Sequence, residues 1–175
     1  MRNLILACAV TVLTLSMTAC STVQPGKDAM LAGYTNVFVK PLSFSEVVLQ
    51  KVAGSDQEKF NDAKPALARS FNESFSRAQP KTKHPLKVVF EGTTGADTVV
   101  LEPKLSLIDP GIKNVLRGRG VATCRLTDSS SGKLLGSYTV SREVNRPEWG
   151  TSSEAIEELV RGLGAEAARH MPEAR

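Results

Sequence analysis

Cysteine and histidine are the residues of this chain best suited to covalent chemistry or metal binding, and the sequence has only three cysteines and two histidines. The histidines, His84 and His170, have no spacing from cysteines or carboxylates that is typical of a metal site. A serine or cysteine hydrolase needs a histidine beside its nucleophile, and no such arrangement is indicated. Carboxylates from distant segments could still meet in space, but no pattern nominates a pair. We therefore predict no catalytic residue, no metal and no cofactor, and we do not expect an enzyme.

Cys20 follows a segment that is typical of exported proteins. Arg2 precedes a mostly apolar run over residues 4–17, and residues 17–19 (Met-Thr-Ala) place small side chains directly before the cysteine. This segment resembles a bacterial lipoprotein signal, in which an aliphatic residue and two small residues precede an obligatory cysteine. The resemblance implies that residues 1–19 are a signal peptide and that Cys20 becomes the first residue, carrying diacylglycerol and palmitate.

Two other interpretations of this segment stay open. A membrane-spanning helix needs about 20 apolar residues, and residues 3–26 carry no charge. Threonines and serines dilute that run, however, and Pro25-Gly26 ends it. An ordinary secretory signal that is cut after small residues is the other interpretation. In bacterial lipoproteins an Asp after the acylated cysteine commonly signals inner-membrane retention, and Ser21 stands there instead. We therefore expect a lipid anchor in the outer membrane, with the protein on its periplasmic face.

The remaining chain is long enough for one domain. Removal of residues 1–19 from the 175-residue chain leaves 156 residues, which suits a single hydrophobic core. Residues 20–33 are mostly small and polar and are expected to form a lipidated tether, and residues 34–172 a single domain. Loss of Arg2 lowers the formal charge from +4 to +3. This value is well below that of a dedicated nucleic-acid-binding domain, so no nucleic acid is expected as a partner.

Two helices are expected from capping boxes, in which a Ser or Thr oxygen and a Glu three residues later satisfy early backbone donors. Ser55 with Glu58 and Thr151 with Glu154 fit this pattern, and apolar stripes at three- and four-residue steps follow both. Pro65 interrupts the first stripe. It either kinks the helix or lies in the first turn of a helix that begins later.

Runs of β-forming residues predict strands at 34–39, 87–90 and 97–108, and a β-hairpin over 121–140. Pro103 within the third run predicts a bulge or an edge position. The order is strand, helix, strands, hairpin and helix. It predicts an α+β fold, in which a mixed, mostly antiparallel sheet has two helices packed on one face.

Cys124 is the thiol that a lipidated mature chain would keep, so no intramolecular disulfide is expected. Strand alternation places it on the same apolar face as Ala122 and Leu126. Free cysteine is among the most buried residue types, and we predict a buried, unreactive thiol.

Candidate contact residues gather near the hairpin. Gly118-Arg119-Gly120 lacks the third glycine of a dinucleotide fingerprint and the Gly-Lys-Ser/Thr end of a P-loop. The densest basic neighbourhoods are Lys113, Arg117, Arg119 and Arg125, and Lys81, Lys83 and Lys87. Such patches could dock an anionic surface or simply be solvated. Trp149 is the only tryptophan and is either a partner anchor or part of the core.

Several short patterns are shared with a known group of proteins. They are Tyr34-x-x-Val37-x-Val39 after a short tether, Gly118-x-Gly120 before a strand, and Leu126-x-Asp128-x-x-x-Gly132-Lys133-x-Leu135 before a C-terminal helix. The chain resembles, over most of residues 31–172, a family of bacterial lipoproteins with a domain of unknown function. The resemblance implies an α+β fold similar to the amino-terminal domain of the Tol-Pal translocation protein. It also implies kinship with envelope lipoproteins that activate or assemble larger machines, and it supplies no catalytic residue.

These observations favour a non-enzymatic, lipid-anchored periplasmic domain that binds a protein partner, or itself, in cell-envelope assembly or secretion. The expected contact surface comprises the hairpin at 121–140 with Arg117, Arg119 and Trp149. The alternative is a carrier of a small molecule, lipid or glycan, bound between the sheet and the first helix. Such a carrier would have the side chains of Leu67, Phe71 and Phe75 facing a void.

Overall fold

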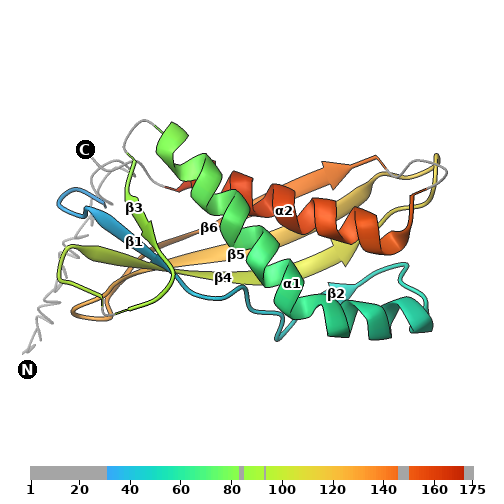
Figure 1. Ribbon diagram of the computed structural model, residues 1–175, viewed down its shortest axis with the longest axis horizontal. Helices are drawn as coiled ribbons and strands as arrows, with labels where there is room; N and C mark the ends of the chain where they lie inside the picture. Colours follow the sequence, from blue (N-terminus) through green and yellow to red (C-terminus); the bar gives the residue numbers. More distant parts are fainter. Residues whose placement is uncertain (1–30, 83–84, 93, 146–149, 172–175) are drawn as a thin grey trace, which may run out of the picture.

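The computed structural model describes residues 31–82, 85–92, 94–145 and 150–171. Within these ranges the chain forms two α-helices, one 3-10 helix and a single mixed sheet of six strands (Figure 1). In chain order the elements are β1 (Asn36–Val39), β2 (Val48–Leu49), α1 (Gly54–Ala78), the 3-10 helix η2 (Gln79–Lys81), β3 (Lys87–Val89), β4 (Thr98–Asp109), β5 (Gly118–Asp128), β6 (Leu134–Val144) and α2 (Ser152–His170). The predicted α+β class and its order of elements are confirmed.

The sheet is built around the long strand β4. The strands follow the order β3-β1-β4-β5-β6, and β2 pairs with the far end of β4. The longest pairings, β4 with β5 and β5 with β6, are antiparallel, whereas the short strands β1, β2 and β3 pair in parallel. The hairpin expected at 121–140 is therefore present as β5 and β6 and extends further at both ends.

Pro103 occupies an edge position in β4. On the side away from β5, β1 pairs with the start of β4 and β2 with its end, and Pro103 lies between these two pairings. The backbone N–H of Ser43 donates to the carbonyl oxygen of Pro103 at 2.9 Å, and Leu105 N–H donates to Ser43. The absence of an N–H on Pro103 therefore costs no neighbouring strand a hydrogen bond. The irregularity in the β4–β5 register falls at Leu105–Leu107 and not at Pro103.

Helix α1 does not begin with the predicted capping box. It starts at Gly54, its N-cap is Ala53, and no side chain caps it, so the box assigned to Ser55 and Glu58 is wrong. Pro65 lies in the helix interior, where a proline costs about 3 kcal/mol. Burial outweighs this cost, because the apolar stripe on either side of Pro65 packs into the core at Phe60, Leu67, Phe71 and Phe75.

Helix α2 begins as predicted. The N–H of Glu154 donates to Thr151 Oγ1 at 3.1 Å, and the N–H of Thr151 donates to Glu154 Oε2 at 2.8 Å. The bond from the Thr151 N–H, with a second from the Thr151 hydroxyl at 3.0 Å, favours the ionised carboxylate and lowers the pKa of Glu154.

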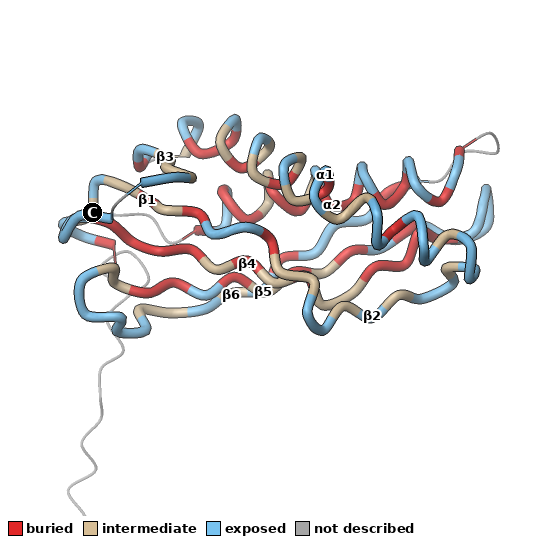
Figure 2. Tube along the Cα trace, turned by 60° about the horizontal axis from the view of Figure 1, so that its bottom comes forward, coloured by how far each residue is buried: buried red, intermediate tan, exposed pale blue. Residues whose placement is uncertain are grey.

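Both helices lie on one side of the sheet (Figure 2). Helix α2 packs on β4, β5 and β6, and α1 packs along α2. Cys124 and Leu126 of β5 point toward the helices and are fully buried. The predicted burial of Cys124 is thus confirmed, and burial raises the pKa of its thiol to about 12. In the described part of the chain, neither helix combines the length and the apolar character that crossing a membrane requires.

Candidate interaction surface

The face of the sheet opposite the helices is open and polar. In β5, residues that point toward the helices alternate with outward-facing ones, as expected for a strand covered on one side. Register places Lys104, Thr123 and Thr139 side by side across three strands, and Glu102, Arg125 and Ser137 beside them. The outward-facing side chains of this open face are Glu102, Lys104, Ser106, Arg119, Val121, Thr123, Arg125, Ser137, Thr139, Ser141 and Glu143.

The structure brings together two of the predicted contact residues, Arg117 and Arg119. Arg117 pairs with Glu143 at 3.6 Å, and Arg119 lies opposite Glu143 in the β5–β6 register. The basic neighbourhood expected from the sequence is divided, however. Arg125 lies six residues further along β5, which is about 20 Å in an extended strand. Lys113 lies in the loop before β5.

Arg125 lines a separate hollow of about 430 Å³ on the open face. Lys40 from the segment after β1 pairs with Glu102 there, and Lys104 pairs with Glu46 at 2.5 Å. Exposed ion pairs of this kind contribute little to stability. The hollow depends on the parallel pairing of β1 with β4, and no local sequence pattern reveals a contact between such distant segments.

A second hollow, of about 490 Å³, lies between α1 and the segment that follows β3. Phe90 and the polar side of α1 line it, and Asn72 Oδ1 is buried there without a hydrogen-bond partner in the described part of the chain. It is separate from the packed interior. Leu67, Phe71 and Phe75, which the carrier hypothesis expects to face a void, are buried within the hydrophobic core.

The loop between β4 and β5 exposes three apolar residues that are not among the predicted contact residues. The exposed fractions are 44% for Ile112, 73% for Val115 and 47% for Leu116. The signal was present in the sequence as an apolar, basic stretch, Ile112 to Arg117, between two glycines. The prediction considered only its charges.

Asp128 organises the turn between β5 and β6. Its carboxylate accepts hydrogen bonds from the hydroxyls of Ser130 at 2.7 Å, Ser131 at 2.6 Å and Tyr34 at 2.8 Å. These donors hold the pKa of Asp128 well below its usual range. Burial, with the bond to the carboxylate, raises the pKa of Tyr34 to about 12. This arrangement ties the turn to the start of β1, and nothing in it resembles a nucleophile with its base.

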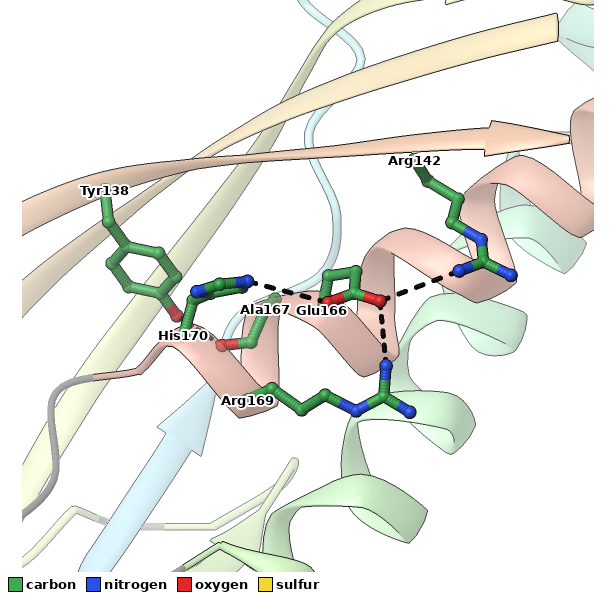
Figure 3. A network of polar contacts seen from close by, with 6 residues as sticks. All are labelled: Tyr138, Arg142, Glu166, Ala167, Arg169 and His170. Atoms are coloured by element: carbon green, nitrogen blue, oxygen red, sulfur yellow. Dashed lines mark hydrogen bonds and ion pairs between the residues drawn. The ribbon is translucent and has the colours of Figure 1, made fainter. Parts of the chain in front are cut away.

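His170 lies in the last turn of α2. Figure 3 shows its ring pointing to Glu166, which also faces Arg142 and Arg169. The ion-pair distances from Glu166 are 3.6 Å to His170, 3.7 Å to Arg142 and 2.7 Å to Arg169. Nearby, the Tyr138 hydroxyl donates to the carbonyl oxygen of Ala167 at 2.8 Å and joins β6 to α2 (Figure 3).

Other predicted residues fall outside the described part of the chain, namely Cys20, Lys83, His84 and Trp149. Over residues 31–171, leaving aside 83–84, 93 and 146–149, no three histidine, cysteine or carboxylate side chains converge as metal ligands. Gly120 of the Gly118-Arg119-Gly120 pattern lies inside β5. A Cβ there would lie 3.0 Å from the Leu163 side chain. It serves close packing of α2 on the sheet.

Neither a protein-family model nor a curated protein matches the chain. Solved structures share its fold. The PelC dodecamer from Paraburkholderia phytofirmans is 15% identical, with 85% of this chain and 94% of that chain covered and a TM-score of 0.50. Protein XCC0632 from Xanthomonas campestris, of the DUF330 family, is 12% identical, with 78% and 83% covered and a TM-score of 0.50. Lipoprotein GNA1162 from Neisseria meningitidis is 15% identical, with 78% and 99% covered and a TM-score of 0.30.

At these identities the comparisons concern the fold alone. The fold is similar to that of XCC0632, whose own family has no known function. The likeness to the amino-terminal domain of the Tol-Pal translocation protein stays a prediction.

Proposed function

We propose that this chain is a non-enzymatic lipoprotein, anchored through lipid on Cys20 to the periplasmic face of the outer membrane, and that it binds a protein partner there. The partner belongs to cell-envelope assembly or secretion. The anchor is supported by the signal-like segment that ends at Cys20. A similar fold occurs in the PelC dodecamer, where it builds a large assembly.

The observation that carries the proposal is the open face of β4, β5 and β6. The helices cover only the opposite face, so a broad surface of hydroxyl and charged side chains stands on rigid strands (Figure 2). Such surfaces give orientation and specificity to a protein contact through hydrogen bonds and charge complementarity. The outer edge of β6 adds a second feature, because no described strand pairs with it. A partner strand could extend the sheet along this 11-residue edge.

A second copy of the chain is the first partner to consider. PelC, which shares the fold, is a dodecamer. The carrier hypothesis has less support, because the side chains between the sheet and α1 that would face its ligand are packed against one another.

In-cell photo-cross-linking tests the proposal. A photoreactive residue would replace Thr139 on the open face, and in the control Glu158 on the exposed side of α2. We expect a dominant protein product from position 139, identified by mass spectrometry, and none from position 158. The product should decrease in a Cys20→Ser background, because loss of the lipid removes the protein from the membrane. Equal products at both positions, or none at 139 in correctly fractionated membranes, would contradict the proposal.

A further inference from the structure

We infer that the loop between β4 and β5 is a membrane-contact site, whose apolar side chains enter the interface of a bilayer that carries anionic headgroups. This inference concerns the loop beyond the end of the open face, and Arg119 lies where the two meet. Only the position of the loop relative to the lipid anchor rests on the proposed lipidation of Cys20.

The first observation is a concentration of exposed apolar surface. Five large apolar side chains are strongly exposed among the described residues, and three of them, Ile112, Val115 and Leu116, lie in this one loop. Val115 is the most exposed of the five, at 73%. Single exposed apolar residues are ordinary, but three at one tip mark an interaction site.

The second observation is the charge around these side chains. Residues 110–119 contain Lys113, Arg117 and Arg119 and no carboxylate. The nearby Glu143 of β6 pairs with Arg117 at 3.6 Å and leaves a net positive charge on these four residues. The carboxylate at the base of the loop, Asp109, is held by the ammonium of Lys51 at 2.6 Å and by the N–H of Gly111 at 2.9 Å. Aliphatic side chains flanked by cations are typical of segments that insert into the interface of anionic membranes.

The loop is also preorganised. The backbone N–H groups of Ile112 and Leu116 each donate to the other's carbonyl oxygen at 3.0 Å, and Val115 N–H donates to Ile112 at 3.0 Å. These bonds satisfy the backbone groups that would otherwise oppose entry into a less polar medium. Gly111 has φ of +74°, and a Cβ there would overlap the carbonyl oxygen of Leu116. The turn therefore needs glycine at this position.

The position of the loop makes contact with the anchoring leaflet feasible. It lies at the end of the elongated domain where β4 ends, far from the start of β1 (Figure 1). Strand β4, with 12 residues, spans about 40 Å. Of the expected tether, residues 20–33, Leu31 is fully buried in the core, and residues 20–30 before it can extend to about 35 Å. The domain can thus lie along the membrane with the lipid at one end and the loop at the other. A Cys20 that carries diacylglycerol and palmitate is stably attached by lipid alone, so contact through the loop orients the domain on the leaflet.

The test uses the protein purified from membranes and reconstituted into vesicles. Val115→Cys carries an environment-sensitive fluorophore, and Leu134→Cys is the matched control. Leu134, at the start of β6 and the opposite end of β5, has an exposed fraction of 49%. Cys124 is fully buried and should not be labelled in the folded protein. Vesicles consist of phosphatidylcholine, with or without phosphatidylglycerol.

We expect a blue-shifted emission at position 115 in the anionic vesicles, with quenching by spin-labelled lipids, and water-like emission at position 134. Lys113→Glu, introduced with Val115→Cys, should reduce the blue shift without changing the circular dichroism spectrum. Water-like emission at position 115 in both vesicles, or equal shifts at 115 and 134, would overturn the inference. The mass of the mature protein reports the lipid separately. The measurement therefore distinguishes a protein without its anchor from a loop that does not insert. The same vesicles can also be added to a protein without the anchor.

Discussion

Gly164 of α2 lies directly against the backbone of Phe71 in α1. A Cβ at Gly164 would overlap the carbonyl oxygen of Phe71 and would lie 3.1 Å from its Cα. The two helices therefore cross at backbone contact, with the Phe71 side chain fully buried beside the crossing. This close approach fixes the crossing of the two helices that cover one face of the sheet.

Gly164→Ala should destabilise the protein. The added methyl group has no space, so the helices must separate, and overpacking of this kind costs about 1–3 kcal/mol. Urea denaturation followed by circular dichroism measures the loss. Gly54→Ala is the control, because nothing lies within 4 Å of a Cβ at that position. The control should leave the unfolding free energy unchanged or raise it by up to about 1 kcal/mol, since alanine is the better helix former. Equal effects of the two substitutions would contradict this account of the helix crossing.

The two sequence-predicted capping boxes should respond differently to alanine. Thr151→Ala removes the oxygen that accepts from Glu154 N–H, and loss of an N-cap costs about 1 kcal/mol. Ser55→Ala should change the unfolding free energy by less than about 0.5 kcal/mol, because Ser55 is exposed and does not cap α1. Thermal or urea unfolding of both variants tests the pair. A larger loss from Ser55→Ala would mean that α1 is capped at Ser55 after all.

The capping boxes also show what local sequence can and cannot predict. A box identifies where a helix can start, and Thr151 with Glu154 has that role. Helix α1 instead starts at Gly54 with Ala53 as its N-cap and no side-chain cap, and the apolar residues on both sides of Pro65 are buried in the core. Helix and strand types, the hairpin and the burial of Cys124 follow from periodicity, which is a local property.

The surface was harder to predict because it depends on pairing between distant segments. Arg117, Arg119 and Arg125 are close in sequence, but an extended strand separates the last from the first two by about 20 Å. Lys40 reaches Glu102 only because β1 pairs in parallel with β4. The exposure of Val115 depends on whether another element covers the loop, which hydrophobicity alone does not indicate.

Asp128→Asn should weaken the protein at neutral pH and flatten its response to acid. Hydrogen bonds from Ser130, Ser131 and Tyr34 hold the pKa of Asp128 below its ordinary value of 3.8. The folded state therefore favours the ionised form, and this stabilisation is present above the unfolded pKa and is lost as the pH falls below it. Unfolding free energies from about pH 7 to pH 2 measure the effect. Asp62→Asn, on the exposed side of α1, is the control and should keep the wild-type slope. The same slope in Asp128→Asn as in the wild type would contradict the role of this carboxylate.

Cys124 should be unreactive in the folded protein. Burial raises the pKa of its thiol to about 12, so almost no thiolate forms near pH 8, and the side chain is closed to reagent. Iodoacetamide labelling at about pH 8, read by mass spectrometry of the peptide that contains Cys124, should be negligible without denaturant and complete in urea. Val115→Cys gives an exposed thiol in the same chain, and that residue should react at once.

The raised pKa of Cys124 also has a consequence for stability. In the unfolded chain the pKa of the thiol is near its ordinary value of 9.0, so the thiol ionises at a lower pH than in the folded protein. The folded state is therefore favoured below about pH 9 and loses this advantage as the pH rises toward about 12. Cys124→Ala should remove part of the alkaline loss of stability, at the cost of a small cavity beneath α2. Rapid labelling of Cys124 in the native protein would show instead that α2 opens from the sheet easily. Helix α2 packs on α1 as well as on the sheet, so such opening would also break the buried contact of Gly164 with Phe71.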